Sequence, residues 1–310
     1  MTGNVVESAP AAKHIEGDLT SDRSPFIAEA QRTGTVYVCQ PYELYSESNH
    51  ASWKMLYGNM REYWRRYAAP AYLEGIERLN LDPDRVPRLE DVNRFLQPLT
   101  GFRAVGVGGY LPAFYFFDNL HNREFPTTIT IRPEGAAFAE WPDIFHDITG
   151  HVPLHTDPDF AATLARMGDC AHTAVAMARE ARGDTDRMQR LTGNIRALSR
   201  FFWFTVETGL MRQGGELKVY GSALLSSSGE IMHAMSDNVA KRPVDIETII
   251  NQAFIPNQYQ PVLYITESFE QLYELVDRIE EWMHEGKLDS VAGGGPLVSE
   301  SDLNSFLQHV

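Results

Sequence analysis

Two histidines and a distant glutamate are the side chains in this sequence best suited to bind a metal ion. His146 and His151 lie five residues apart, with Asp147 between them, and Glu207 follows the apolar run Phe201–Phe204. An ionised carboxylate in such a setting is costly to bury unless a cation or hydrogen-bond donors compensate it. Two imidazoles and one carboxylate form the ligand set of non-haem iron(II) oxygenases, which hold one face of an octahedral ion and leave the other positions open. The set therefore predicts an iron site.

The spacing of these residues leaves other interpretations open. On a regular helix His146 and His151 would point about 140° apart, which differs from the zinc-protease spacing His-Glu-x-x-His. We expect Gly150 to let the backbone turn so that both rings meet one ion. Zinc accepts the same three ligands, so a zinc-dependent hydrolase is an alternative of a different class. A purely structural interpretation places one histidine in the core and pairs Glu207 with Arg200.

Composition and charge restrict the class of protein. The chain has 310 residues, of which 43% are hydrophobic and 22% charged, with a formal net charge of −15. This charge argues against a nucleic-acid partner, because phosphate neutralisation needs clustered Lys and Arg. No apolar run approaches the roughly 20 residues that span a bilayer, and the first residues lack the pattern of a signal peptide. The two cysteines form no disulfide framework, so we expect a cytoplasmic protein.

The order of apolar, β-branched and helix-forming residues predicts an α+β fold that is predominantly helical. Residues 106–112 contain three glycines and a proline and are expected to form a plain loop, since they lack the context of a phosphate-binding loop. The expected helices cover 51–79, 89–96, 113–120, 160–182, 187–210 and 269–284. The expected strands cover 36–39, 127–132, 217–225 and 262–266.

The strong compositional boundaries lie near the two ends of the chain. Residues 1–34 are rich in small, polar and acidic side chains and are expected to form a flexible leader. Residues 35–285 are expected to form a single catalytic domain. Gly293-Gly-Gly-Pro marks a flexible link within a C-terminal tail that covers 286–310.

Several ordered segments of the chain resemble one enzyme family. Pro142-Asp-Ile-Phe-His-Asp-Ile-Thr-Gly-His-Val-Pro-Leu resembles the iron-binding signature of the pterin-dependent aromatic amino acid hydroxylases. Trp203-Phe-Thr-Val-Glu-Thr-Gly-Leu is similar to the segment that carries the third iron ligand, and Tyr220-Gly-Ser-Ala-Leu-Leu-Ser-Ser-Ser-Gly-Glu to the next block. Shorter blocks match in the same order: Thr100-Gly-Phe, Phe116-Phe-Asp-Asn-Leu, Arg123-Glu-Phe-Pro and Gln260-Pro-Val-Leu-Tyr. The resemblance covers roughly residues 35 to 285 and is nearest to the bacterial phenylalanine hydroxylase type, so it implies the catalytic-domain fold of that family.

The resemblance also implies roles in substrate binding. Arg132 matches the arginine that binds the substrate carboxylate, a task that suits a planar guanidinium because it forms two parallel hydrogen bonds. Trp203 matches the residue that packs against the substrate ring. Ser226 and Glu230 match residues that order the amino acid pocket, and Thr208 follows the third ligand in the pocket wall. Without the resemblance, ordinary core packing would be the expectation for Trp203.

The cofactors implied by the resemblance are Fe(II), a tetrahydropterin and O2 as co-substrate. Phe116 matches the phenylalanine that stacks on the pterin, although core packing would again explain it without the resemblance. Asp147 and Leu111 are expected beside the pterin. The residues that match the iron ligands are His146, His151 and Glu207.

Four departures from the family pattern concern mainly the substrate pocket. Trp141 stands where the family usually has glutamate, and Thr208 where it usually has phenylalanine. The segment from Arg132 to His146 is one residue shorter than usual. The segment between His151 and Glu207 is about fifteen residues longer, with the extra length near 170–186, where lengthened helices and a surface loop are expected.

The sequence thus predicts an iron(II)- and tetrahydropterin-dependent monooxygenase that hydroxylates the ring of an aromatic L-amino acid. Phenylalanine is the first candidate, with a para or meta product. The same chemistry on tryptophan or another aromatic amino acid in secondary metabolism is an alternative. We expect a small-molecule amino acid as partner, no nucleic acid and no membrane. The expected state is a monomer or small homo-oligomer.

Overall fold

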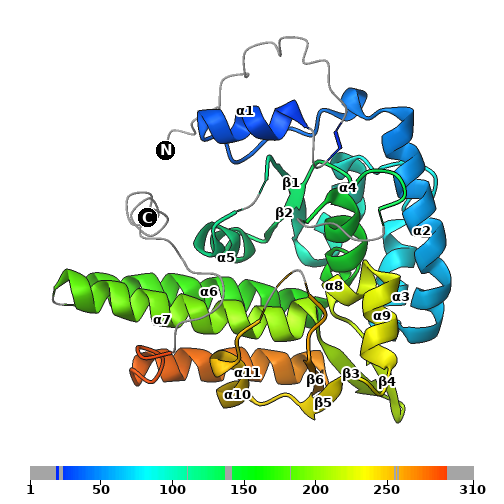
Figure 1. Ribbon diagram of the computed structural model, residues 1–310. Helices are drawn as coiled ribbons and strands as arrows, with labels where there is room; N and C mark the ends of the chain where they lie inside the picture. The colour runs from blue at the N-terminus through cyan, green and yellow to red at the C-terminus, as the bar shows by residue number, and fades with distance from the viewer. Residues whose placement is uncertain are drawn as a thin grey trace.

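The computed structural model describes residues 19–20, 24–109, 111–136, 142–181, 183–254, 256 and 258–291, and helices dominate the fold (Figure 1). The α+β, predominantly helical prediction is confirmed. The α-helices are α1 (Pro25–Thr33), α2 (Glu47–Tyr67), α3 (Pro70–Leu79), α4 (Leu89–Thr100), α5 (Ala113–His121), α6 (Pro158–Glu180), α7 (Asp184–Phe202), α8 (Ser222–Leu225), α9 (Ser228–Met235), α10 (Ile246–Asn251) and α11 (Phe269–His284). The strands are β1 (Arg103–Val107), β2 (Glu124–Thr128), β3 (Leu210–Gln213), β4 (Glu216–Val219), β5 (Ala240–Pro243) and β6 (Val262–Thr266).

The single helix predicted for residues 51–79 is two helices, α2 and α3. Ala68 and Ala69 have extended backbones, and Pro70 is the first residue of α3. The residue before a proline is driven away from the helical region by the proline ring. Ala69 instead donates its backbone N–H to the carbonyl oxygen of Val219, at 2.8 Å. The break therefore joins the helical layer to the strand that precedes α8.

Helices α6 and α7 lie side by side, with α11 along them, and form the longest layer of the fold (Figure 1). The Asp157 side chain caps the first turn of α6 by accepting two backbone N–H groups. Arg166 of α6 bonds Asp277 of α11 at 2.6 Å and also pairs with Glu280. The helices predicted for 160–182 and 269–284 are confirmed as α6, which ends at Glu180, and α11, and residue 182 lies outside the described residues. The extra length expected near residues 170–186 stays a prediction.

The strands form two small sheets. β1 and β2 pair in parallel, and the second sheet has the order β4-β3-β6-β5. The strand predicted for 262–266 is β6 and is confirmed. The strand predicted for 127–132 begins earlier, at Glu124, and ends at Thr128. Residues 36–39 form only an isolated bridge between Tyr37 and Val107 rather than a strand.

Three further predictions of secondary structure were wrong in part. Gly106 belongs to β1 rather than to a loop. The helix predicted for 187–210 ends at Phe202, after which the chain forms a π-helix and then β3. The strand predicted for 217–225 is β4 followed by the short helix α8. The last two differences lie at the metal centre, where tertiary contacts outweigh local preference.

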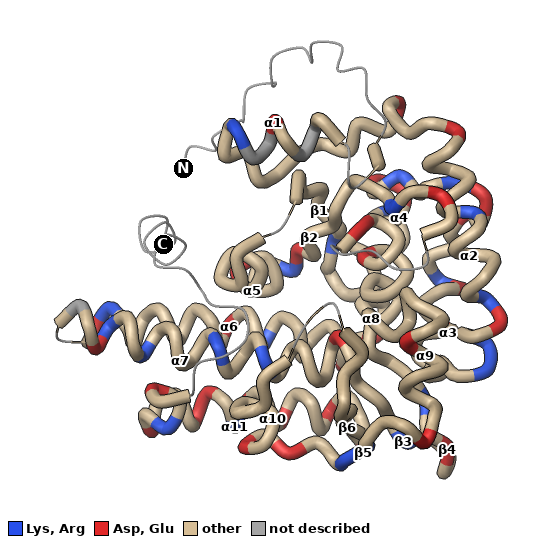
Figure 2. The backbone as a smooth tube through the Cα atoms, viewed as in Figure 1, with Lys and Arg blue, Asp and Glu red and all other residues tan. Residues whose placement is uncertain are grey.

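Described residues at both ends of the chain contact the domain. Leu19 is buried, and its carbonyl oxygen accepts the N–H of Ile131 at 2.8 Å. At the other end Val291 accepts a hydrogen bond from Arg196 of α7 at 2.7 Å. The divisions at residues 34 and 285 stay predictions. Among the described helices none is long and apolar enough to cross a membrane, and Lys and Arg are interspersed with acidic residues along the chain (Figure 2).

Candidate metal centre

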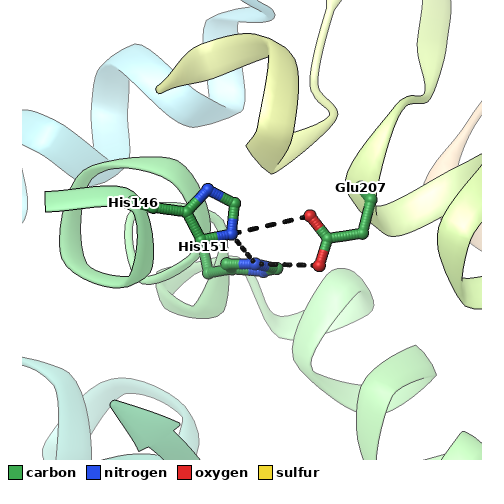
Figure 3. Close-up of side chains that lie close together, drawn as sticks. All are labelled: His146, His151 and Glu207. Atoms are coloured by element: carbon green, nitrogen blue, oxygen red, sulfur yellow. Dashed lines mark hydrogen bonds and ion pairs between the residues drawn. The ribbon is translucent and has the colours of Figure 1, made fainter. Parts of the chain in front are cut away.

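The side chains of His146, His151 and Glu207 converge on one point (Figure 3). The two Nε2 atoms of the histidines lie 3.1 Å apart. His151 Nε2 lies 3.3 Å from Glu207 Oε1, and His146 Nε2 lies 3.7 Å from Glu207 Oε2. Within the described part of the chain, this is the one group of three or more His, Cys, Asp or Glu residues whose ligand atoms all lie within 4.8 Å of one another.

Both segments that carry these ligands are π-helices, which the sequence did not predict. One covers His146–His151 and the other Trp203–Glu207. The N–H of Val152 bonds the carbonyl oxygen of Asp147, and that of Thr208 bonds the carbonyl oxygen of Trp203, each a step of five residues. The wider turn places residues five apart on the same face, so the two histidine rings meet instead of diverging by about 140°.

Gly150 contributes to the site by close packing rather than by turning the backbone. It lies within the π-helix, so the expected turn at this residue was wrong. A Cβ atom at position 150 would lie 2.6 Å from the carbonyl oxygen of Ser222 in α8. Glycine is therefore required for the π-helix of the histidines to approach α8 so closely.

Helix α8 supplies a hydroxyl group to two of the ligands. Ser222, at its first position, donates to Glu207 Oε2 at 2.6 Å. Ser226, just after its end, lies 2.8 Å from Nδ1 of His146 and 3.2 Å from the carbonyl oxygen of Ala223. We infer that Nδ1–H of His146 donates to Ser226, which in turn donates to Ala223. This tautomer leaves the lone pair on Nε2 of His146 directed at the metal position.

The electrostatics of the site keep the ligands in their metal-binding charge states. Burial disfavours the imidazolium and lowers the pKa of His146 to about 4, despite the nearby carboxylate. Burial alone would raise the pKa of Glu207, but His151, His146 and the Ser222 hydroxyl lower it to about 2. At neutral pH His146 is therefore neutral and Glu207 is ionised.

The three donors fit an octahedral iron ion. Ligands at right angles on an ion about 2.1 Å from its donors lie about 3 Å apart, close to the observed separations of 3.1 and 3.3 Å between His151 Nε2 and its two neighbours. Two facing imidazole lone pairs beside a carboxylate also favour a cation between them. A metal ion at this point would be held by all three side chains.

Replacing Ser222 by alanine is expected to weaken metal binding. The change removes the hydrogen bond that fixes the Glu207 carboxylate, and losses of such partners typically reduce metal affinity by about 10–100-fold. Fe(II) affinity, measured by competition with a chelator, should fall in Ser222→Ala. The control is Ser199→Ala, because Ser199 bonds only a carbonyl group of its own helix, that of Ile195. Equal affinities in the two variants would reject the assignment.

Replacing Gly150 by alanine is expected to destabilise the fold and to displace His151. The added methyl group would overlap the carbonyl oxygen of Ser222, and overpacking of this kind costs about 1–3 kcal/mol. Chemical denaturation of the metal-free protein and its iron content would report both effects. The matched control is Gly58→Ala in α2, where a Cβ meets no atom within 4 Å. A Gly150→Ala protein as stable as this control would contradict the packing argument.

Arg132 is linked to the metal centre through Asp143, whose role the sequence did not reveal. The two side chains form a buried bidentate pair with two nitrogen–oxygen distances of 2.8 Å. Asp143 also accepts the backbone N–H groups of Arg132, at 2.8 Å, and of His146, at 3.0 Å. Although burial alone would raise it, Arg132 lowers the pKa of the Asp143 carboxyl group. The charged residue directly after Pro142, inside the iron-binding signature, was the available signal.

The other residues expected in the substrate pocket come from the π-helix of Glu207, from the residue that follows it and from α9. The Trp203 ring stacks on Phe254, with 4.4 Å between centroids and 9° between planes. Thr208 is buried and donates its hydroxyl to the carbonyl oxygen of Trp203 at 2.9 Å. Glu230 is the third residue of α9, and burial raises its pKa to about 7. Their roles toward a substrate stay predictions.

Of the residues expected near the pterin, Phe116 is connected to His151 through the ring of Phe202. Phe116 meets Phe202 edge to face at 5.0 Å, and Phe202 stacks on His151 at 6.2 Å. Asp147 accepts the N–H of Thr128 at 2.7 Å, and burial raises its pKa to about 7. Leu111 is buried just before α5. Phe202 was not expected at the site, and the run of apolar residues around it hid its position.

Known proteins are similar to this chain in both sequence and fold. The model of the biopterin-dependent aromatic amino acid hydroxylases matches residues 27–286. The phenylalanine-4-hydroxylase of Chromobacterium violaceum is 33% identical over 237 residues, which are 76% of this chain and 75% of that protein. That of Vibrio cholerae is 34% identical over 236 residues, 76% of each chain. Rat tyrosine 3-monooxygenase is 36% identical over 74% of this chain but only 44% of its own length.

Solved structures agree with these relatives. The C. violaceum phenylalanine hydroxylase with bound oxidised Fe(III) aligns with a TM-score of 0.73 and 31% identity, over 83% of this chain and 89% of that one. The same enzyme bound to cobalt aligns with a TM-score of 0.72 and 29% identity, over 85% and 90%. The matched segment contains both π-helices and all three candidate ligands. The chain belongs to the biopterin-dependent aromatic amino acid hydroxylase family.

Proposed function

We propose that this protein hydroxylates the ring of an aromatic L-amino acid, with phenylalanine as the first candidate. The observation that carries the proposal is the convergence of His146, His151 and Glu207 within a chain of this family. Relatives from C. violaceum and V. cholerae named phenylalanine-4-hydroxylase support phenylalanine and the para product. The zinc-hydrolase alternative is not favoured by these comparisons.

Some residues of the chain would hold the metal, and others would orient the amino acid and the pterin. Iron and the reduced pterin, when bound, supply the activation of O2. His146, His151 and Glu207 would hold the ion by one face, which leaves positions for other ligands. The Arg132 guanidinium, which Asp143 orients through two hydrogen bonds, would bind the carboxylate of an amino acid.

Aromatic rings would orient the substrate and the pterin. Trp203 precedes Glu207 in the same π-helix, so a substrate ring packed against it would lie close to the metal. Phe116 is half-buried and contacts Phe202, whose ring stacks on His151, so a pterin stacked on Phe116 would be linked to the metal position through Phe202 and His151. Thr208 is smaller than the phenylalanine usual in the family, and a wider pocket would bring a meta product within reach.

A single incubation separates the candidate substrates and products. The protein is supplied with Fe(II), a tetrahydropterin and O2, together with phenylalanine, tyrosine or tryptophan, and products are identified by mass and retention time. We expect para-tyrosine from phenylalanine. Meta-tyrosine would assign the altered pocket a role in ring position, and turnover of tryptophan alone would replace the proposed substrate. Absence of O2 consumption with all three amino acids would reject the function.

The cellular setting completes the proposal. A small-molecule amino acid is the expected partner, and the formal net charge of −15 supports the expectation of no nucleic-acid partner. The protein would act in the cytoplasm as a monomer or small homo-oligomer. Sedimentation analysis of the purified chain tests the oligomeric state.

A further inference from the structure

Helices α5 and α6 carry the same pair of side chains at the same spacing. Asp118 and His121 lie three residues apart on α5, and Asp169 and His172 lie three residues apart on α6. Residues three apart share one face of a helix, so each helix presents an aspartate beside a histidine. We call these four residues the histidine–aspartate quartet.

The two pairs face each other across the helix contact. His121 Nδ1 lies 2.6 Å from Asp169 Oδ1, and His172 Nε2 lies 2.7 Å from Asp118 Oδ1. The two imidazole rings stack with centroids 4.0 Å apart and 22° between planes. Each histidine thus bonds the aspartate of the opposite helix, and the helices run antiparallel at this point.

Gly168 fixes the distance between the two helix backbones. A Cβ atom at this position would overlap the backbone nitrogen of His121 and lie 2.7 Å from the carbonyl oxygen of Phe117. The close approach therefore depends on glycine and on backbone contact rather than on the exposed ion pairs. In Figure 1, α5 lies directly against α6. The four side chains of the quartet therefore project from two helices whose backbones are in close contact.

We propose that the quartet binds a divalent transition-metal ion of the zinc class at a site separate from the iron centre. Imidazole nitrogen and carboxylate oxygen are the donors that zinc accepts in four-coordinate sites. Two carboxylates balance the charge of a divalent cation. Acid-x-x-His pairs on neighbouring helices are also the arrangement by which helix bundles hold metals.

Metal binding requires a change of side-chain orientation. Two stacked rings cannot direct their lone pairs at one ion, so one imidazole must rotate out of the stack. The exposed fractions, 40% for His121 and 30% for His172, leave room for such a rotation. The ion would then replace the hydrogen bonds that link each ring to an aspartate. Helix α5 also carries Phe116, which is expected to contact the pterin. The bound ion would therefore link this helix to α6.

The test counts zinc ions in a protein whose iron centre has been disabled. In the His146→Ala/Glu207→Ala background, equilibrium dialysis against Zn²⁺ followed by elemental analysis should give one Zn²⁺ per chain. Adding His121→Ala and His172→Ala should remove that ion. The near-isosteric Asp118→Asn/Asp169→Asn pair should also remove it, and Zn²⁺ should raise Tm in the parent but in neither quartet variant. The control is His284→Ala, which changes an exposed histidine on α11 and should retain the ion.

Two outcomes would overturn the proposal. One is a parent protein that binds no Zn²⁺, and the other is a quartet variant that binds as much as its parent. The same quartet changes in the otherwise unaltered chain should leave one Fe(II) bound, which separates this site from the iron centre. Circular dichroism of each variant verifies that the helices are intact, and the Asp→Asn pair keeps the test decisive if the histidine variant does not fold.

Discussion

Glu207→Ala is expected to leave the protein folded but unable to retain iron, with loss of turnover. The change removes the only carboxylate of the set that His146 and His151 complete. The loss of Fe(II) affinity should exceed the ~10–100-fold that follows from changes to the partners of metal ligands. Iron content after dialysis and the initial rate of hydroxylation are the two measurements. Both should fall together, because the metal is required for the chemistry.

The stability of the metal-free form provides the internal control for Glu207→Ala. Glu207 is surrounded by buried residues, and its charge is compensated in the metal-free state by Ser222 and His151. Removing the Glu207 side chain should therefore have a small effect on the free energy of unfolding of the metal-free protein and a large effect on its iron content. Glu216→Ala is the matched variant, because that carboxylate is 74% exposed on β4. Retention of iron and turnover by Glu207→Ala would show that another residue supplies the third ligand.

Arg132→Lys is expected to raise the KM for the amino acid while iron stays bound. Lysine keeps the positive charge beside Asp143 but loses the planar pair of donors that matches a carboxylate. Disrupting one partner of a buried charged hydrogen-bonded pair costs about 2–5 kcal/mol, so a rise in KM of more than tenfold is expected. Steady-state kinetics with the iron-loaded variant measure the KM and kcat separately.

Asp143→Asn separates binding by Arg132 from support of the fold. Asparagine can keep one hydrogen bond to the guanidinium and can still accept a backbone N–H group, but it no longer compensates the charge of Arg132, which is only 4% exposed. An uncompensated buried charge costs about 3–5 kcal/mol. We expect lower stability together with a raised KM. Arg85→Lys is the control because its ion pair with Glu47 is exposed, and such pairs contribute about 0–1 kcal/mol. An unchanged KM in Arg132→Lys would exclude Arg132 from substrate binding.

The proposed reaction and the proposed zinc site concern different parts of one helical frame. The candidate iron ligands come from two π-helices that meet at α8, whereas the histidine–aspartate quartet lies where α5 packs against α6. Phe116 of α5 contacts Phe202, and the Phe202 ring stacks on His151. A zinc ion at the quartet would therefore be expected to influence pterin binding through α5, and the pterin KM measured with and without Zn²⁺ would reveal it.

The sequence by itself predicted the three side chains that converge in the structure and the elements with strong periodicity. His146, His151 and Glu207 could be predicted as candidate iron ligands because few side chains bind iron and because the surrounding segments resemble one family. Helix α11 and strand β6 were predicted correctly because their patterns are local and regular. Residue type and short-range spacing are recorded in the sequence, so inferences that depend on them succeed.

Only the tertiary structure decided how the ligands meet. The five-residue step of the two π-helices has no distinct sequence pattern, since it depends on contacts such as that of Gly150 with Ser222. The buried pair of Arg132 with Asp143 and the bond from Ser222 to Glu207 join segments that are not neighbours on a regular helix or strand. Such contacts depend on how distant elements pack, and local preferences do not contain that information.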